Sequence, residues 1–153
     1  MKLEFDKRYP VAALPEQAWA VLADFRATAA CWPGGVLSTQ LDSRRYRGGA
    51  AVPIGADTLQ VEGGLELIAL DAPRRELRLR GHGEAAGGSP VSVDLVARIE
   101  AGELADTSAL VGRAAVTVDG ALAAFDKRLL ASAGDRLLAQ FVDHFRAAAA
   151  ARK

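Results

Sequence analysis

The chain has 153 residues, half of them apolar and a quarter charged, with 19 acidic and 19 basic side chains. This composition is typical of one globular domain, residues 1–153, and excludes a disordered chain. Because the charges balance, no overall field favours nucleic acid, and we expect no nucleic-acid partner. The single cysteine, Cys31, excludes an internal disulfide and a cysteine-rich metal site.

No segment carries the apolar run of a signal peptide or of a membrane-spanning helix. We therefore expect a cytoplasmic protein whose contact with a membrane, if it makes one, is peripheral at the inner face. Two arginine clusters, residues 44–47 and 74–80, fit solvated outer strand faces, and the alternative is contact with anionic lipid.

Residues 2–11 alternate apolar and charged side chains, the period-two pattern of a strand with one buried face. Lys7 interrupts the apolar face, where a buried ammonium needs a partner or a ligand carbonyl, although such lysines more often extend to the rim of the core. The apolar members of this face are Leu3, Phe5, Tyr9 and Val11.

Two short helices are predicted after this strand. Pro15 suits the first turn of a helix over residues 15–23, because the N–H that proline lacks would have no partner there. Asp24 is placed to cap a second helix that extends to about Ala30, and the run Pro33-Gly34-Gly35 ends it.

From residue 35 to about residue 119 the pattern predicts strands separated by turn residues, and no helix. Apolar side chains alternate with charged ones, as in residues 76–80, so each strand has one solvated face, as in an antiparallel meander. Glycine pairs at 48–49 and 63–64 lie inside strands, where they permit bulges and sharp bends. We predict a curved antiparallel sheet of about seven strands.

The segment from about Ala121 to Ala150 repeats apolar residues every three or four positions and predicts one long helix, with Gly134 as its weak point. The fold class is therefore α+β. A strongly curved sheet has a concave face wider than one helix, and aromatic residues make up only 6% of the chain. We expect the remaining space to hold a ligand, and the alternative is a fully packed core.

Three stretches carry a family resemblance: residues 13–19 at the first helix, residues 31–35 in the next loop and residues 119–130 at the start of the long helix. In this order they resemble the CoxG family of carbon monoxide dehydrogenase accessory proteins, within the START-like (SRPBCC) helix-grip superfamily. Gly35 stands where the family has a second cysteine. The resemblance implies a helix-grip fold and a non-enzymatic accessory protein that links a CO dehydrogenase-like molybdenum hydroxylase to the membrane. Its implied ligand is hydrophobic, a lipid or a quinone.

We expect no catalytic residue, no metal and no cofactor. Ser132 and His144 are twelve residues apart on one predicted helix, about 18 Å by rise, which is too far for a nucleophile and its base. Cys31 is predicted to be a small buried apolar group. The predicted ligand-binding residues are Phe5, Lys7, Tyr9 and Val11 on the first strand, Trp32 at the pocket mouth, and Leu122, Phe125, Leu129 and Phe141 on the long helix.

Two other functions share this fold. An enzyme of the cyclase or aromatase type would need an acid or base aimed into the cavity, where Lys7 and Tyr9 are the available groups. A pure assembly factor would keep a vestigial pocket.

Overall fold

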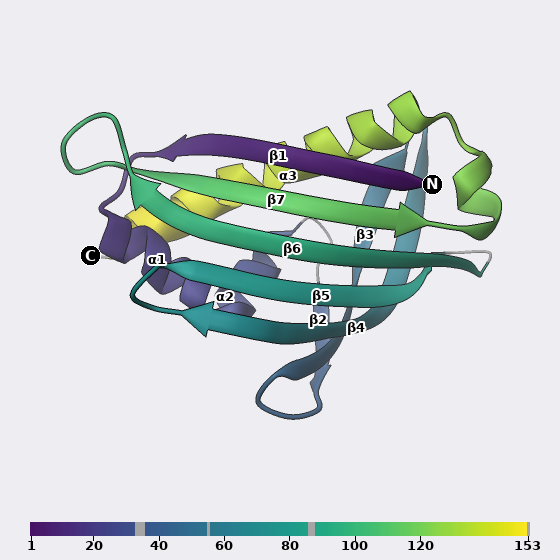
Figure 1. The fold of residues 1–153 in the computed structure, drawn as a ribbon, viewed down its shortest axis with the longest axis horizontal. Coiled ribbons are helices and arrows are strands. Elements are labelled where there is room, and N and C mark those ends of the chain that lie inside the picture. Colours follow the sequence, from purple (N-terminus) through teal and green to yellow (C-terminus); the bar gives the residue numbers. More distant parts are fainter. Residues whose placement is uncertain (33–35, 55, 86–87, 153) are drawn as a thin grey trace.

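The structure, a computed structural model, describes residues 1–32, 36–54, 56–85 and 88–152. Within them, one curved antiparallel sheet lies over a long C-terminal helix and two short helices (Figure 1). The elements in chain order are β1 (Lys2–Val11), α1 (Pro15–Ala23), α2 (Phe25–Ala30), β2 (Val36–Gln40), β3 (Arg45–Ile54), β4 (Asp57–Asp71), β5 (Glu76–Ala85), β6 (Ser89–Ala101), β7 (Ser108–Val118), the 3-10 helix η1 (Gly120–Ala124) and α3 (Lys127–Ala151).

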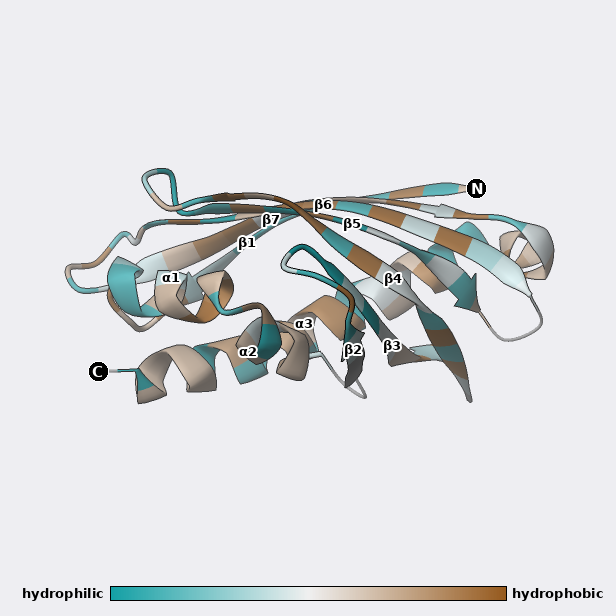
Figure 2. Ribbon diagram, turned by 90° about the horizontal axis from the view of Figure 1, so that it is seen from below, coloured by the Kyte–Doolittle hydropathy of each residue, from teal (hydrophilic) through white to brown (hydrophobic). Residues whose placement is uncertain are grey.

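The strand order in the sheet is β1-β7-β6-β5-β4-β3-β2, so β1 and β2 form its two edges in the described residues. Every neighbouring pair is antiparallel. The predicted curved sheet of seven strands is therefore confirmed, and α1, α2 and α3 all lie on its concave side (Figure 2).

Both short helices begin at the predicted residues. Pro15 opens α1, and the carboxylate of Asp24 accepts a hydrogen bond of 3.2 Å from the backbone N–H of Ala27 in the first turn of α2. The predicted stop at Pro33-Gly34-Gly35 lies outside the described residues.

The glycine pairs lie where the strands are irregular or bent, as predicted. The register shift between Leu37 and Thr39 of β2 lies opposite Gly48 on β3, whereas the shift between Leu67 and Ala69 lies away from both pairs. Gly63 faces Gly83 across the β4–β5 pair, and a Cβ on Gly63 would lie 2.5 Å from the Cα of Gly83. Two strands can approach this closely only without side chains, and β4 and β5 bend in this part of the sheet (Figure 1).

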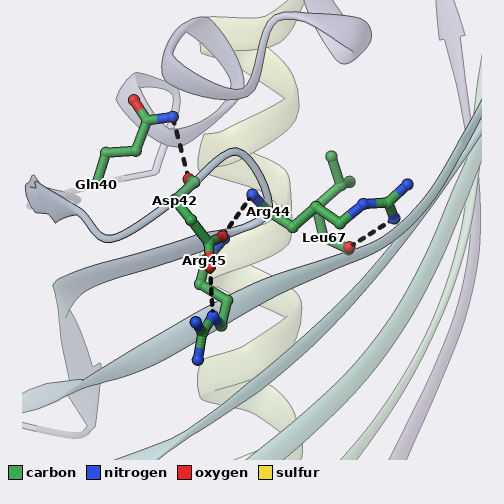
Figure 3. A network of polar contacts seen from close by, with 5 residues as sticks. All are labelled: Gln40, Asp42, Arg44, Arg45 and Leu67. Carbon is green, nitrogen blue, oxygen red and sulfur yellow. Dashed lines mark hydrogen bonds and ion pairs between the residues drawn. The ribbon is translucent and has the colours of Figure 1, made fainter.

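The turn between β2 and β3 is held by its own polar groups (Figure 3). The carboxylate of Asp42 accepts hydrogen bonds from the backbone N–H groups of Arg44 and Arg45 and pairs with the Arg45 guanidinium at 2.7 Å. The Arg44 guanidinium donates to the carbonyls of Leu67 and Ile68 on β4. These arginines therefore fix the hairpin to the sheet, which favours the intramolecular interpretation of the cluster at residues 44–47.

The long helix begins later than predicted. Residues 120–124 form η1, Phe125 and Asp126 leave the helical conformation, and Asp126 caps α3 by accepting a hydrogen bond of 2.8 Å from the Arg128 N–H. The buried hydroxyl of Ser89 accepts the N–H of Leu122 at 3.0 Å. This bond fixes η1 to the sheet.

Within the described residues, α3 lies closest to α1 and to β1 and β3, which stand at or next to the two sheet edges, and it lies farther from the central strands β4–β7. The helix thus bridges the concave face. None of the helices described is long and apolar enough to cross a membrane.

Candidate ligand-binding site

The inward-facing side chains are buried at the strand ends and half-exposed in the middle. On β6, Ala97 and Ile99 are buried but Val93 and Leu95 are not, and β1, β3 and β7 repeat the pattern. A packed interior would bury its centre most completely, so the middle of the concave face is accessible to solvent. We call these half-exposed positions the central band: Phe5, Lys7, Tyr9, Ala50, Val52, Leu65, Leu67, Leu79, Val91, Val93, Leu95, Gly112, Ala114 and Val116.

Gly112 shows that this space is open. It pairs with Lys7 on β1 and with Ala97 on β6, so a side chain here would point inward. A Cβ built on Gly112 would have one heavy atom within 4 Å, the carbonyl oxygen of Val96 at 3.8 Å, and would touch no atom of α3. The helix therefore leaves space over Gly112, on β7 beside the edge strand β1.

The core is divided into two clusters that flank this space. One joins Val11, Leu77 and Ile99 to Phe141 and Phe145 at one end of α3. The other joins Leu3, Ile54 and Val118 to Leu130 and Ala133 at the other end. Between them on α3, Leu137 and Leu138 are only half-buried. The described residues thus form two packed ends with a less filled middle.

Two open hollows of about 460 and about 630 Å³ lie on the opposite, outer face of the sheet. Outward-pointing polar residues are part of both linings, with Glu62 and His82 in the first and the ion pair of Arg80 with Asp94 in the second. The second lining also includes Phe5, Leu79, Leu95 and Ala114 of the central band. No described residue of α3 lines either hollow. The candidate site is therefore defined by the exposure of the central band and by Gly112.

The four predicted residues of β1 all point to the concave face. Phe5, Lys7 and Tyr9 belong to the central band, whereas Val11 is buried in the end cluster with Phe141. The ring of Phe5 packs against α3 at Gly134.

Trp32 and Phe141 come together as an aromatic pair. Their ring centroids are 4.3 Å apart and the rings are tilted by 33°. Phe141 is buried and Trp32 is half-exposed at the edge of the same cluster, so Trp32 is the member of the pair that solvent can contact.

The three remaining predicted residues lie near the start of α3. Leu122 is buried in the second cluster and belongs to η1 rather than to the long helix, and Leu129 packs against that cluster. Phe125 precedes α3 and is 44% exposed, so its predicted place on the long helix is wrong, and its contact with a ligand stays a prediction. The cause is the break at Asp126 described above.

Lys7 forms an ion pair with Asp135 of α3, with Nζ and Oδ1 2.9 Å apart. This hydrogen bond raises the pKa of the Lys7 ammonium, and burial raises the pKa of the neighbouring Tyr9 hydroxyl. Both groups therefore remain proton donors at neutral pH. We call Lys7, Tyr9 and Asp135 the polar seam. Lys7 extends to the rim, with 36% of its side chain exposed.

Sequence reasoning missed Asp135 and Gly112. Asp135 follows Gly134 inside an apolar helical repeat, and its facing Lys7 was itself an exception in an apolar strand face. A basic residue in an apolar strand face and an acidic residue in an apolar helical repeat could have been predicted to pair with each other. The sequence contains no comparable signal for Gly112, because glycine occurs inside strands for several structural reasons.

Cys31 and His144 lie near each other, but the bond between them involves the Cys31 backbone and not its thiol. Cys31 is buried, which raises the pKa of its thiol, and its Sγ faces the carbonyl of Ala27 at 3.3 Å. His144 contacts the carbonyl of Cys31 through Nδ1 at 2.9 Å, not the sulfur. In the described part of the chain, no cluster of three or more histidine, cysteine and acidic residues could hold a metal ion.

The fold is shared with solved structures over nearly the full chain. A conserved protein from Geobacillus kaustophilus has a TM-score of 0.84 at 19% identity, covering 97% of this chain and 95% of that chain. The Zhui aromatase/cyclase from Streptomyces sp. R1128 has a TM-score of 0.71 at 16% identity, covering 99% and 96%. A START superfamily protein from Mycobacterium smegmatis has a TM-score of 0.63 at 12% identity, covering 94% of each chain.

These similarities define a protein of START-like helix-grip fold. No curated protein matches the chain. The model of one family, described as polyketide cyclase / dehydrase and lipid transport, matches residues 2–150. The chain therefore belongs to that family.

Proposed function

We propose that the protein binds a hydrophobic small molecule, a lipid or a quinone, between the central band and α3, and that it performs no chemistry on this ligand. The observation that carries the proposal is the open space over Gly112 between two packed core clusters. Apolar surface that water contacts is unfavourable, and a hydrophobic ligand would cover it. A family that includes lipid-transport proteins is consistent with this role.

The finer part of the proposal is an accessory role beside a CO dehydrogenase-like molybdenum hydroxylase. Its support is the similarity of residues 13–19, 31–35 and 119–130 to the corresponding stretches of the CoxG family. Co-expression with such a hydroxylase tests it. We expect the two proteins to co-purify, and separate elution of both would exclude a stable complex.

Binding is tested with N-phenyl-1-naphthylamine, a neutral apolar dye that fluoresces when it leaves water. We expect wild-type protein to bind the dye, and Gly112→Leu to weaken binding by about tenfold because the new side chain occupies the ligand space. Ser92→Leu is the matched control, since Ser92 is exposed on the outer face of β6. Equal binding by both variants would place the dye elsewhere and contradict the proposal.

Native mass spectrometry of freshly purified protein supplies an independent measurement. We expect a retained lipid or quinone in wild-type protein and its loss in Gly112→Leu. Ligand-free protein that also binds no dye would favour an assembly factor.

The second candidate is an aromatase or cyclase, favoured by the similarity to the Zhui structure and by the donors of the polar seam. Lys7 and Tyr9 would then protonate or orient a folded polyketone. Formation of an aromatic product from a linear polyketone thioester, lost in Lys7→Met, would establish the enzyme and replace the binding proposal.

A further inference from the structure

The polar groups of the central band lie together at one side of the ligand space. Lys7 and Tyr9 are its two polar members, and both come from β1, an edge strand of the sheet. Their partner Asp135 comes from α3. The remaining members are aliphatic, aromatic or glycine. On the sheet side, a ligand in this space would therefore meet apolar members of the central band along most of its length and the hydrogen-bond donors of Lys7 and Tyr9 at the β1 edge.

This side of the ligand space lies between two contacts that join β1 to α3. On one side the Phe5 ring packs against α3 at Gly134. On the other side Arg146 of α3 donates through Nε to the carbonyl of Pro10 at 2.9 Å. Lys7 and Tyr9 lie between these contacts and are half-exposed, so solvent reaches the polar seam between β1 and α3.

The charges at this place are balanced. Lys7 pairs with Asp135 at 2.9 Å, and the nearby Arg146 pairs with Asp143 at 3.4 Å. Each cation therefore already has its carboxylate. An anionic head would meet Asp135 beside Lys7, and it would have to displace that carboxylate or tolerate its repulsion.

A neutral acceptor meets no such obstacle. The Lys7 ammonium has three N–H donors, and its pair with Asp135 leaves others free to bind a carbonyl oxygen. The Tyr9 hydroxyl supplies a further donor. From this geometry we infer that the ligand is an apolar molecule with an uncharged carbonyl head, such as an ester, ketone or quinone, and that the Lys7–Asp135 pair selects it over a carboxylate of equal length. The inference rests on the proposed function.

A matched pair of ligands tests the inference by displacement of N-phenyl-1-naphthylamine. Methyl decanoate and decanoate share one chain and differ in head-group charge. We expect wild-type protein to bind the ester about tenfold more tightly than the carboxylate at neutral pH. Asp135→Asn keeps an acceptor for Lys7 but removes the negative charge, so decanoate should gain about tenfold while the ester changes by less than about twofold.

Asp6→Asn is the control for net charge. Asp6 lies one residue from Lys7, points to the outer face and pairs with Arg113 at 3.5 Å, so its loss should leave both affinities unchanged. Lys7→Met should weaken the ester by about fivefold through loss of the donor. Circular dichroism and thermal unfolding identify any variant that does not fold, and Asp135→Asn preserves shape.

The outcomes distinguish a failure of the head-group inference from a failure of the proposed function. The inference is wrong if the dye binds but decanoate and the ester displace it with equal affinity. It is also wrong if Asp135→Asn leaves the ratio of these two affinities unchanged. In both cases the proposal of apolar ligand binding stands. If neither the dye nor either ligand binds wild-type protein, the proposed function is wrong, and the inference with it.

Discussion

The ring of Phe5 on β1 lies where a side chain on Gly134 of α3 would stand, with Phe5 Cε1 2.7 Å from the position of a Cβ on that glycine. Glycine normally weakens a helix interior by about 1 kcal/mol relative to alanine. Here it allows an aromatic ring to contact the helix backbone at the edge of the ligand space. The residue that weakens α3 locally is therefore the residue that lets β1 and α3 approach.

A double-mutant cycle tests this contact. We expect Gly134→Ala to destabilise the wild-type protein by about 1 kcal/mol, because the Phe5 ring must move. In a Phe5→Ala background the same change should stabilise by up to about 1 kcal/mol through helix propensity. Urea unfolding of the four proteins measures the coupling. An equal effect of Gly134→Ala in both backgrounds would show that the ring and the glycine are independent.

Two strand glycines should respond oppositely to alanine. A Cβ on Gly63 would lie 2.5 Å from the Gly83 Cα. Because backbone atoms cannot move aside as the end of a side chain can, Gly63→Ala should destabilise the folded protein by about 3 kcal/mol. Gly112→Ala places its methyl in open space and restricts the unfolded chain, so it should stabilise by about 0.5 kcal/mol. Urea midpoints compare the two, and a large loss in Gly112→Ala would mean that the centre of the central band is filled.

Local patterns predicted much of the fold because the interactions concerned are local. Alternation identified β1 since its inward side chains are all less exposed than its outward ones, and Pro15 and Asp24 marked α1 and α2 since a cap bonds within its own turn. The start of α3 was missed because the apolar spacing continues through the break at Phe125 and Asp126. Ser89, on β6, takes the Leu122 N–H and fixes η1, while the spacing of Leu122, Phe125 and Leu129 is helical.

The candidate site was predicted on its strand side and missed on its helix side. Phe5, Lys7 and Tyr9 share a face by period alone, so their inward direction followed from the sequence. The partner of Lys7 lies 128 positions away, and only the packing of α3 against β1 selects Asp135. The bulge between Leu67 and Ala69 was likewise hidden, because register depends on the paired strand.

Two buried serines should respond oppositely to loss of the hydroxyl. Ser108 is 1% exposed, and its Oγ has no hydrogen-bond partner among the described residues, so Ser108→Ala removes an unsatisfied group and should stabilise by about 1 kcal/mol. Ser89→Ala leaves the Leu122 N–H unpaired and should cost about 2 kcal/mol. Thermal unfolding measures both. A clear loss in Ser108→Ala would reveal a partner for its hydroxyl.

The stability of the fold should depend on pH through the carboxyl group of Asp24. The hydrogen bond from the Ala27 N–H, followed by the bond from Arg152 at 2.9 Å, lowers the pKa of the Asp24 carboxyl in the folded protein. A depressed folded pKa means that the charged carboxylate stabilises the fold above the unfolded value, near 3.8, and that this stabilisation is lost as the pH falls through the folded value. Asp24 thus links the start of α2 to the C-terminal end of α3 only while it is ionised.

Asp24→Asn keeps the cap but removes the charge, so the difference in unfolding free energy from wild type isolates the carboxylate. We expect wild type to be more stable at pH 7 by about 0.5 kcal/mol and the difference to shrink toward zero below pH 3.8. Arg152→Met should reduce the difference, because it removes one of the two bonds, whereas Asp24→Ala should cost about 1 kcal/mol through loss of the cap. Urea unfolding between pH 7 and pH 3 measures all four proteins. A difference that stays constant over this range would show that the charge of Asp24 contributes nothing and that the carboxylate acts only as a cap.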